Sequence, residues 1–224
     1  GTGNGLAREL GIPLGLAGAL DLITGDHSLR ALDAIRLAEH TFLLDATVGI
    51  GALMSGVTRR DAKRRFGRLA YIWTGTIKLA GLQPHRFWIT IDGVDHTVRA
   101  AEIIVANSGA IGASHTRLGK HIRPDDGQID IVVLRAGTVP RLLRTVTNVI
   151  MGRQYRDPDI EYLVAERTVM IDTARSLPAQ ADGETIGWTP LAMTVAPEAV
   201  RVIVPSPHAG TRIGHPRPRK RELR

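Results

Sequence analysis

The sequence of 224 residues contains no cysteine, few aromatic residues and no long apolar run. Without cysteine there is no disulfide and no thiolate chemistry, which favours a reducing compartment. The longest apolar stretch, Leu14 to Ile23, is interrupted by Asp21 and is shorter than the roughly 20 residues that cross a bilayer. We therefore expect a cytoplasmic protein without a membrane-spanning segment.

Signatures of several enzyme classes are also missing. There is no Walker A loop and no G-x-S-x-G segment, and the eight histidines include no H-x-x-x-H pair. The glycine clusters at 1–5 and 49–54 both depart from the dinucleotide-binding pattern G-x-G-x-x-G. Esterase, zinc-hydrolase and Rossmann hypotheses therefore have no support. The chain opens at Gly1 without a methionine or a secretory leader, which we interpret as a truncated beginning.

Positive charge is concentrated at the C-terminal end. Residues 212–224 hold six basic residues and one acid, so +5 of the formal charge of +7 lies there. Four prolines in and near this end favour a flexible basic tail at 206–224. The tail is either a solvated extension or a segment attracted to an anionic membrane surface. We do not expect nucleic-acid binding, because no aromatic residues alternate with the basic ones.

Hydrophobic periodicity predicts mostly short strands. Residues 4–11 and 14–24 have helical spacing, and strand patterns follow from about residue 30. Two further helices are predicted at 57–81 and 137–151, and a buried strand at 129–134. Four more short strands are predicted, at 160–174, 177–187, 190–195 and 199–205. Together these elements predict an α+β chain dominated by an antiparallel β-sandwich with flanking helices.

The predicted helix at 57–81 has a basic stripe formed by Arg60, Arg64 and Arg68. Its polar face is either solvated or directed toward an anionic membrane.

Two acidic segments are the candidates for chemistry. Asp125, Asp126 and Asp130 surround Gly127, and such a group of oxygen ligands suits a hard cation such as Mg²⁺. In the segment ADGET, Asp182 and Glu184 are two residues apart, so on an extended backbone both carboxylates point to one side. Taken alone, each segment is equally consistent with an ordinary turn.

The order of the motifs resembles that of the diacylglycerol kinase and sphingosine kinase family of bacterial lipid kinases. The segments are GTGNGLARELGIP, VGIGALM, a basic helix, RPDDGQIDIVVL and ADGE, and the resemblance covers residue 1 to about residue 204. It implies that residues 1–28 end an α/β ATP-binding domain and that 29–205 form the β-sandwich domain. The family's Gly-Gly-Asp-Gly-Thr loop is not in this sequence, so most of the ATP-binding domain is expected to precede Gly1.

The resemblance also implies roles for individual residues. Thr2 lies by the nucleotide and Asn4 supports the phosphate loop. Asp182 is the general base, and Glu184 is its neighbouring acid. The metal residues that the resemblance implies are the Asp126 carboxylate and the backbone carbonyls of Arg123 and Gln128, which hold a structural Mg²⁺.

The implied activity is ATP-dependent phosphorylation of a lipid with an acyl chain, either diacylglycerol-like or sphingoid. Gly5 replaces an aspartate common in diacylglycerol kinases, which leaves the acceptor open. Two alternatives remain at this point, a non-catalytic lipid-binding or regulatory domain and a kinase of a soluble substrate related to NAD kinases. We expect 1–224 alone to be inactive, and the sequence leaves a homodimer open.

Overall fold

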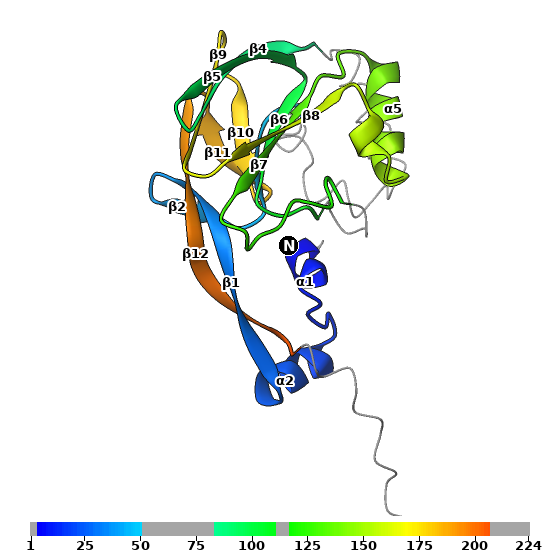
Figure 1. Ribbon diagram of the computed structural model, residues 1–224, viewed down its shortest axis with the longest axis vertical. Helices are drawn as coiled ribbons and strands as arrows, with labels where there is room; N and C mark the ends of the chain where they lie inside the picture. The colour runs from blue at the N-terminus through cyan, green and yellow to red at the C-terminus, as the bar shows by residue number, and fades with distance from the viewer. Residues whose placement is uncertain (1–3, 51–82, 111–116, 207–224) are drawn as a thin grey trace, which may run out of the picture.

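The computed structural model describes residues 4–50, 83–110 and 117–206 of the chain. These residues form two six-stranded antiparallel sheets that pack face to face, with short helices at the periphery (Figure 1). The expected antiparallel β-sandwich is therefore confirmed. No helix within the described ranges has both the length and the apolar character needed to span a membrane.

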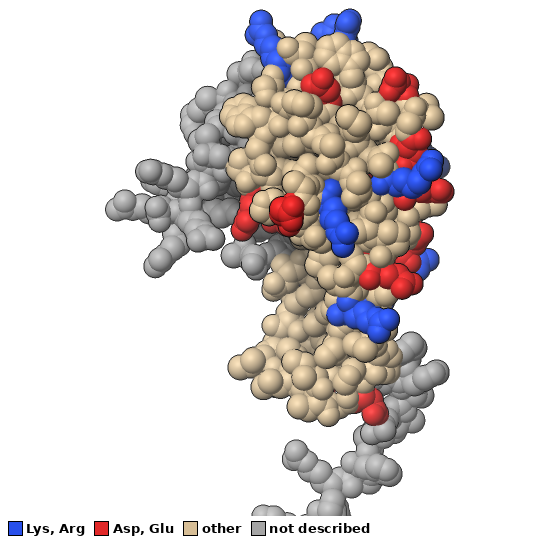
Figure 2. All heavy atoms as spheres, turned by 90° about the vertical axis from the view of Figure 1, so that its left-hand side faces the viewer, with Lys and Arg blue, Asp and Glu red and all other residues tan. Residues whose placement is uncertain are grey.

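The first sheet has the strand order β2-β1-β12-β9-β4-β5. Its strands are β1 (His27–Leu37), β2 (His40–Phe42), β4 (His85–Ile91), β5 (Val94–Ala100), β9 (Thr168–Thr173) and β12 (Leu191–Pro205). Figure 2 shows the side of the molecule on which β5 and β12 lie. Acidic and basic side chains are mixed on this side, and neither sign of charge dominates it.

The second sheet has the order β11-β10-β3-β6-β7-β8. Its strands are β3 (Asp45–Gly49), β6 (Glu102–Ala106), β7 (Ile129–Leu134), β8 (Ile160–Ala165), β10 (Pro178–Ala181) and β11 (Glu184–Trp188). Alternate residues of the central strands, such as Ile103 and Val105 on β6, point into the main core between the sheets. The core is thus built by the two-residue period of the strands.

The N-terminal helices α1 (Gly5–Glu9) and α2 (Leu16–Thr24) lie beside the long ribbon of β1 and β12, which extends beyond the sandwich (Figure 1). A separate small core joins α1 to this ribbon through Leu10, Leu32 and Val204. The register of β1 against β12 shifts between Leu32 and Ala34, so Asp33 lies at an irregularity. The ribbon therefore carries the N-terminal segment on apolar contacts of its own.

Most of the predicted elements are found, with three corrections. The stretch 160–174 is not one strand but two, β8 and β9, which belong to different sheets. The single strand predicted at 177–187 is instead a hairpin of β10 and β11. The last two predicted strands are one continuous strand, β12, because pairing with the long β1 extends it across polar positions.

The helix predicted at 137–151 is α5 (Val139–Ile150), followed by the short 3-10 helix η1 (Gln154–Arg156). The predicted basic helix at 57–81 and the predicted basic tail lie outside the described residues, apart from the first residue of the tail.

Candidate functional site

The hairpin turn between β10 and β11 carries Asp182, whose carboxylate binds a neighbouring strand. Its Oδ2 accepts a hydrogen bond from the amide of Leu43 at 2.9 Å, and its Oδ1 accepts from Leu44 at 2.9 Å and Asp45 at 3.2 Å. The Asp182 amide in turn donates to the Asp45 carbonyl at 3.0 Å. Asp182 and Gly183 both have positive φ, as a tight Asp-Gly hairpin requires. The Asp182 carboxylate thus holds the turn against the start of β3.

Glu184 follows this turn at the start of β11 and is exposed. Within the described residues its carboxylate makes no hydrogen bond and no ion pair. Asp182 and Glu184 were the two acidic residues predicted at this turn. Of these two, only Glu184 has both carboxylate oxygens without a hydrogen bond among the described residues.

Asn107, directly after β6, connects this turn to the rest of the site. Its amide N–H donates to the Leu44 carbonyl, and its side-chain Nδ2 donates to the carbonyls of Leu43 at 2.9 Å and Asp33 at 2.8 Å. The side chain is almost completely buried, and among the described residues its Oδ1 accepts no hydrogen bond. Asn107 thereby ties the segment that holds Asp182 to the irregular position on β1.

Asp33 continues the network to the second acidic segment. Its buried carboxylate accepts hydrogen bonds from the amides of Gly127 at 2.7 Å and Glu198 at 2.9 Å, and its own amide donates to the Pro124 carbonyl. Asp33 of β1 therefore binds the loop at 123–128 near both of its ends, at Pro124 and Gly127, and also binds β12 through Glu198. One chain of hydrogen bonds thus joins the two acidic turns that lie far apart in the sequence.

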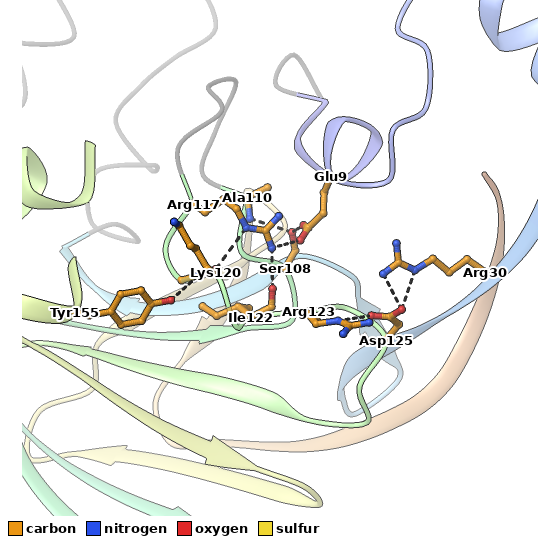
Figure 3. Close-up of polar contacts among 11 residues, drawn as sticks. Glu9, Arg30, Ser108, Ala110, Arg117, Lys120, Ile122, Arg123, Asp125 and Tyr155 are labelled. Carbon is orange, nitrogen blue, oxygen red and sulfur yellow. Dashed lines mark hydrogen bonds and ion pairs between the residues drawn. The ribbon is translucent and has the colours of Figure 1, made fainter. Parts of the chain in front are cut away.

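The acidic residues of the loop at 123–128 have different surroundings. Asp125 forms ion pairs with Arg30 at 2.7 Å and Arg123 at 3.3 Å, and these arginines lower the pKa of Asp125 although burial opposes the change (Figure 3). Among the described residues Asp126 forms no ion pair, and its Oδ1 accepts only the Gln128 amide at 3.2 Å. Desolvation and the negative charge of Asp33 raise the pKa of Asp126, and the Gln128 amide and the charge of Arg123 offset this only in part. Of the two aspartates in this loop, Asp126 is therefore the one whose charge is less well compensated.

This arrangement fits a hard cation bound by one carboxylate and backbone carbonyls. Asp126 has one carboxylate oxygen without a hydrogen bond among the described residues, and it lies in the field of a second carboxylate. Across the described part of the chain, no group of three His, Asp or Glu side chains is arranged to hold a metal. A site here would depend on carbonyl oxygens for its remaining ligands.

Helix α1 is joined to the same region by Glu9 (Figure 3). The buried Glu9 carboxylate binds the Ser108 hydroxyl and forms an ion pair with Arg117 at 2.6 Å. Arg117 also donates to the Ile122 carbonyl at 2.8 Å. Ser108 directly follows Asn107. Ser108 contacts α1, whereas Asn107 binds the segment that holds Asp182 and binds Asp33, which in turn holds the loop at 123–128.

Asp45 is a titratable group that the sequence did not single out. Burial and, secondarily, the charge of Asp182 raise the pKa of Asp45 to about 6. A carboxyl group with a perturbed pKa beside a candidate acid–base residue is characteristic of functional sites. Sequence alone could not identify Asp45, Asp33, Glu9 or Asn107, because each matters through a partner far away in the chain.

The two residues expected near the nucleotide are only partly described. Asn4 begins α1 with a left-handed φ of 48°, and its side chain does not cap the helix. Thr2 lies outside the described residues, as do Arg60, Arg64 and Arg68.

Comparison with known proteins identifies the relatives of this fold. Residues 46–204 match the family described as the YegS C-terminal NAD kinase beta sandwich-like domain. A probable lipid kinase YegS-like of Pseudomonas fluorescens is 32% identical over 92% of this chain and 67% of its own length. A protein of the same description from Pseudomonas aeruginosa is 28% identical, and this chain spans 66% of it. The chain thus spans about two thirds of these relatives.

Solved structures show the same fold. A putative diacylglycerol kinase from Bacillus anthracis superposes with a TM-score of 0.73 at 22% identity, over 91% of this chain and 66% of its own. A second structure of a putative diacylglycerol kinase from Bacillus anthracis gives a TM-score of 0.67 at 21% identity.

Proposed function

Because this chain belongs to the family of YegS C-terminal NAD kinase beta sandwich-like domains, we propose that the whole protein phosphorylates the hydroxyl group of a lipid with ATP. The observation that carries the proposal is the network centred on Asn107, which brings α1, the Asp126 turn and the Asp182 turn to one place. Relatives described as probable lipid kinases support the same reaction. Phosphoryl transfer depends mainly on such positioning.

For ATP, we propose that residues 1–28 belong to the nucleotide-binding part of the protein. Thr2 would contact the nucleotide and Asn4 would support its phosphate loop, consistent with an Asn4 side chain that is not used as a helix cap. The Glu9 contacts with Ser108 and Arg117 would hold this part against the sandwich.

For Mg²⁺, we propose the loop at 123–128. The Asp126 carboxylate and the carbonyls of Arg123 and Gln128 would hold the ion, and its charge would offset the repulsion between Asp126 and Asp33. A bound Mg²⁺ supplies positive charge and rigidity to the loop. Asp125 is already neutralised by Arg30 and remains a structural residue in this proposal.

For the proton transfer, we propose that Glu184 accepts the proton of the lipid hydroxyl and that Asp182 positions the turn. This exchanges the roles inferred from the sequence. The reason is that three backbone amides already occupy the Asp182 carboxylate, whereas that of Glu184 is unoccupied within the described residues. A general base must have an oxygen within hydrogen-bond reach of the proton it removes.

The test is phosphoryl transfer from labelled ATP by the full-length protein. Diacylglycerol and a sphingoid base in detergent micelles are compared with soluble alcohols and with NAD. Labelled lipid is the expected product, and the preferred acceptor separates the two lipid classes. Labelled NAD would identify a soluble-substrate kinase, and lipid binding without transfer would identify a non-catalytic lipid-binding domain. Either result would contradict the proposal.

A further inference from the structure

Helix α5 presents apolar side chains to solvent. Leu143, Val146 and Ile150 are 58%, 46% and 67% exposed, and their spacing of three and four residues places them on one stripe. The stripe continues into Met151, which is 59% exposed at the end of the helix. Thr145 is the one residue of α5 that is fully buried. A helix on the surface of a globular protein ordinarily turns its apolar stripe toward the core.

The side of α5 that faces the protein carries specific polar contacts as well as the half-buried Leu142 and Val149. Arg141 and Arg144 both form ion pairs with Asp159, and Arg144 lies 3.5 Å from Asp157. Both acids are almost completely buried. Asn148 donates to Asp157 at 2.8 Å. These contacts fix the rotation of the helix, so its apolar stripe is held outward by specific bonds.

The charges around the stripe are basic. Between residues 135 and 161 there are five arginines and three acids, and two of these acids are the buried partners of α5. Arg153 and Arg156, just after the helix, are exposed, and within the described residues their guanidinium groups form no ion pair. An exposed apolar stripe next to free cations is complementary to an anionic lipid surface.

The stripe lies close to the candidate site. The hydroxyl of Tyr155 of η1 accepts a hydrogen bond from the Lys120 amide at 2.5 Å (Figure 3). The same hydroxyl lies 2.9 Å from the Nδ1 of His121. The same loop contains Arg117, the partner of Glu9, and continues into residues 123–128. The end of α5 is thus one side-chain contact away from the loop proposed to hold the cation.

We propose that α5 is the membrane-contacting element of this protein, with its apolar stripe in the acyl boundary of an anionic bilayer and Arg153 and Arg156 at the headgroups. The use of this contact in catalysis rests on the proposed lipid substrate, whereas the membrane-binding surface itself is argued from the exposed side chains of α5 and η1. The bilayer is favoured over a second copy or a partner protein because the apolar stripe is combined with exposed arginines, Arg153 and Arg156.

The first test measures sedimentation of the chain with vesicles of phosphatidylglycerol and phosphatidylcholine. The variant Leu143→Ser/Val146→Ser/Ile150→Ser should bind on the order of tenfold more weakly, because three partly inserted aliphatic side chains are lost. The matched control, Leu29→Ser/Val94→Ser/Met170→Ser, removes three equally exposed apolar side chains elsewhere and should bind as the parent does. Equal binding by both triple variants would overturn the inference, as would a parent that does not bind.

The second test uses the absence of cysteine. Ile150→Cys and Val94→Cys each provide one thiol for an environment-sensitive fluorophore. Anionic vesicles should shift the emission of the label at position 150 to the blue and leave the label at position 94 unchanged. No shift at position 150, or a shift that follows protein concentration without vesicles and so indicates a second copy, would overturn the inference. Neither experiment contains ATP, so its failure is distinct from failure of the proposed kinase activity.

Discussion

Two Asp-Gly hairpin turns, one in each sheet, have the same hydrogen-bond pattern. Asp92 between β4 and β5 accepts from three successive backbone amides at the start of β9, at 2.7–2.8 Å, and its own amide donates back to that strand. Asp182 does the same at the start of β3. The Asp92 turn has none of the connections to Asn107 that the Asp182 turn has. The shared pattern is therefore a way of fastening a hairpin to a strand.

The two turns differ in the residue that follows glycine and in the pKa of the carboxyl groups near the turn. Val94 follows the first turn, whereas Glu184 follows the second. The amides that hold Asp92 lower the pKa of that carboxyl group, while the pKa of Asp45 beside Asp182 is raised. Asp-Gly therefore forms the turn in both sheets, and the function of a turn depends on the side chain that follows the glycine.

The largest expected effect separates the two acids of the second turn. In the full-length enzyme, Glu184→Gln should lower kcat by about 10²–10⁴-fold, because the amide cannot accept a proton, with little change in the KM for ATP. Asp182→Asn should lower stability and leave kcat nearer to normal. Measuring kcat and melting temperature for both variants decides the roles. The reverse pattern would restore Asp182 as the base.

Next in size is the effect of disconnecting Asn107. Asn107→Leu leaves two buried carbonyls without a donor, so the free energy of unfolding should fall by about 3 kcal/mol. Hydrogen exchange should quicken at the amides of residues 43–45 and Gly127 but not at those of 166–168, which the Asp92 turn holds. Ile131→Ala is the control for general destabilisation. Equal acceleration at both turns would show that Asn107 does not connect the site.

A smaller effect should be shared by the two turns. Asp92→Asn and Asp182→Asn keep a residue that tolerates positive φ but weaken the charge-assisted acceptance of three amides. Each should lower the free energy of unfolding by about 2 kcal/mol in urea denaturation. A change confined to one variant would contradict the equivalence of the turns.

Asp45 should give the second turn a pH dependence opposite in sign to that of the first turn, where the pKa of Asp92 is lowered. Its folded-state pKa of about 6 exceeds the ordinary value of 3.8, so folding favours the protonated form. Its contribution is therefore favourable at low pH and is lost as pH rises from about 4 to 6. Asp45→Asn should remove this loss and stabilise the chain at pH 7 by about 1–2 kcal/mol. Unfolding followed between pH 4 and 8 checks the sign, and an unchanged pH profile would contradict it.

The smallest expected effect concerns the third Asp-Gly turn, at Asp126. Mg²⁺ at several times its Kd should stabilise the parent by about 1 kcal/mol, seen as a higher melting temperature. Asp126→Ala should abolish this increase, whereas Asp92→Ala, at a turn whose carboxylate is fully hydrogen-bonded, should retain it. If Mg²⁺ changed the melting temperature of both variants equally, the loop would not be the Mg²⁺ site.

Sequence patterns located most elements because the periods of strands and helices are local. The strand at 129–134 agrees with β7 to the residue, and both N-terminal helices were found. The errors arose where pairing decided the outcome. The predicted strand at 160–174 is divided between two sheets, and β12 continues through polar residues because β1 offers it a partner along most of its length.

The sequence by itself determined the antiparallel strand pattern, the possible Asp-Gly turns at Asp126 and Asp182 and the family resemblance, since each depends on neighbouring residues or on the order of motifs. Only the tertiary structure decided which carboxylates are occupied. Asp182 and Glu184 look equivalent in the sequence, but three amides more than 130 positions away bind the first and not the second. The orientation of α5 likewise depends on its ion pairs with Asp157 and Asp159, because periodicity defines an apolar stripe but not the side to which it faces.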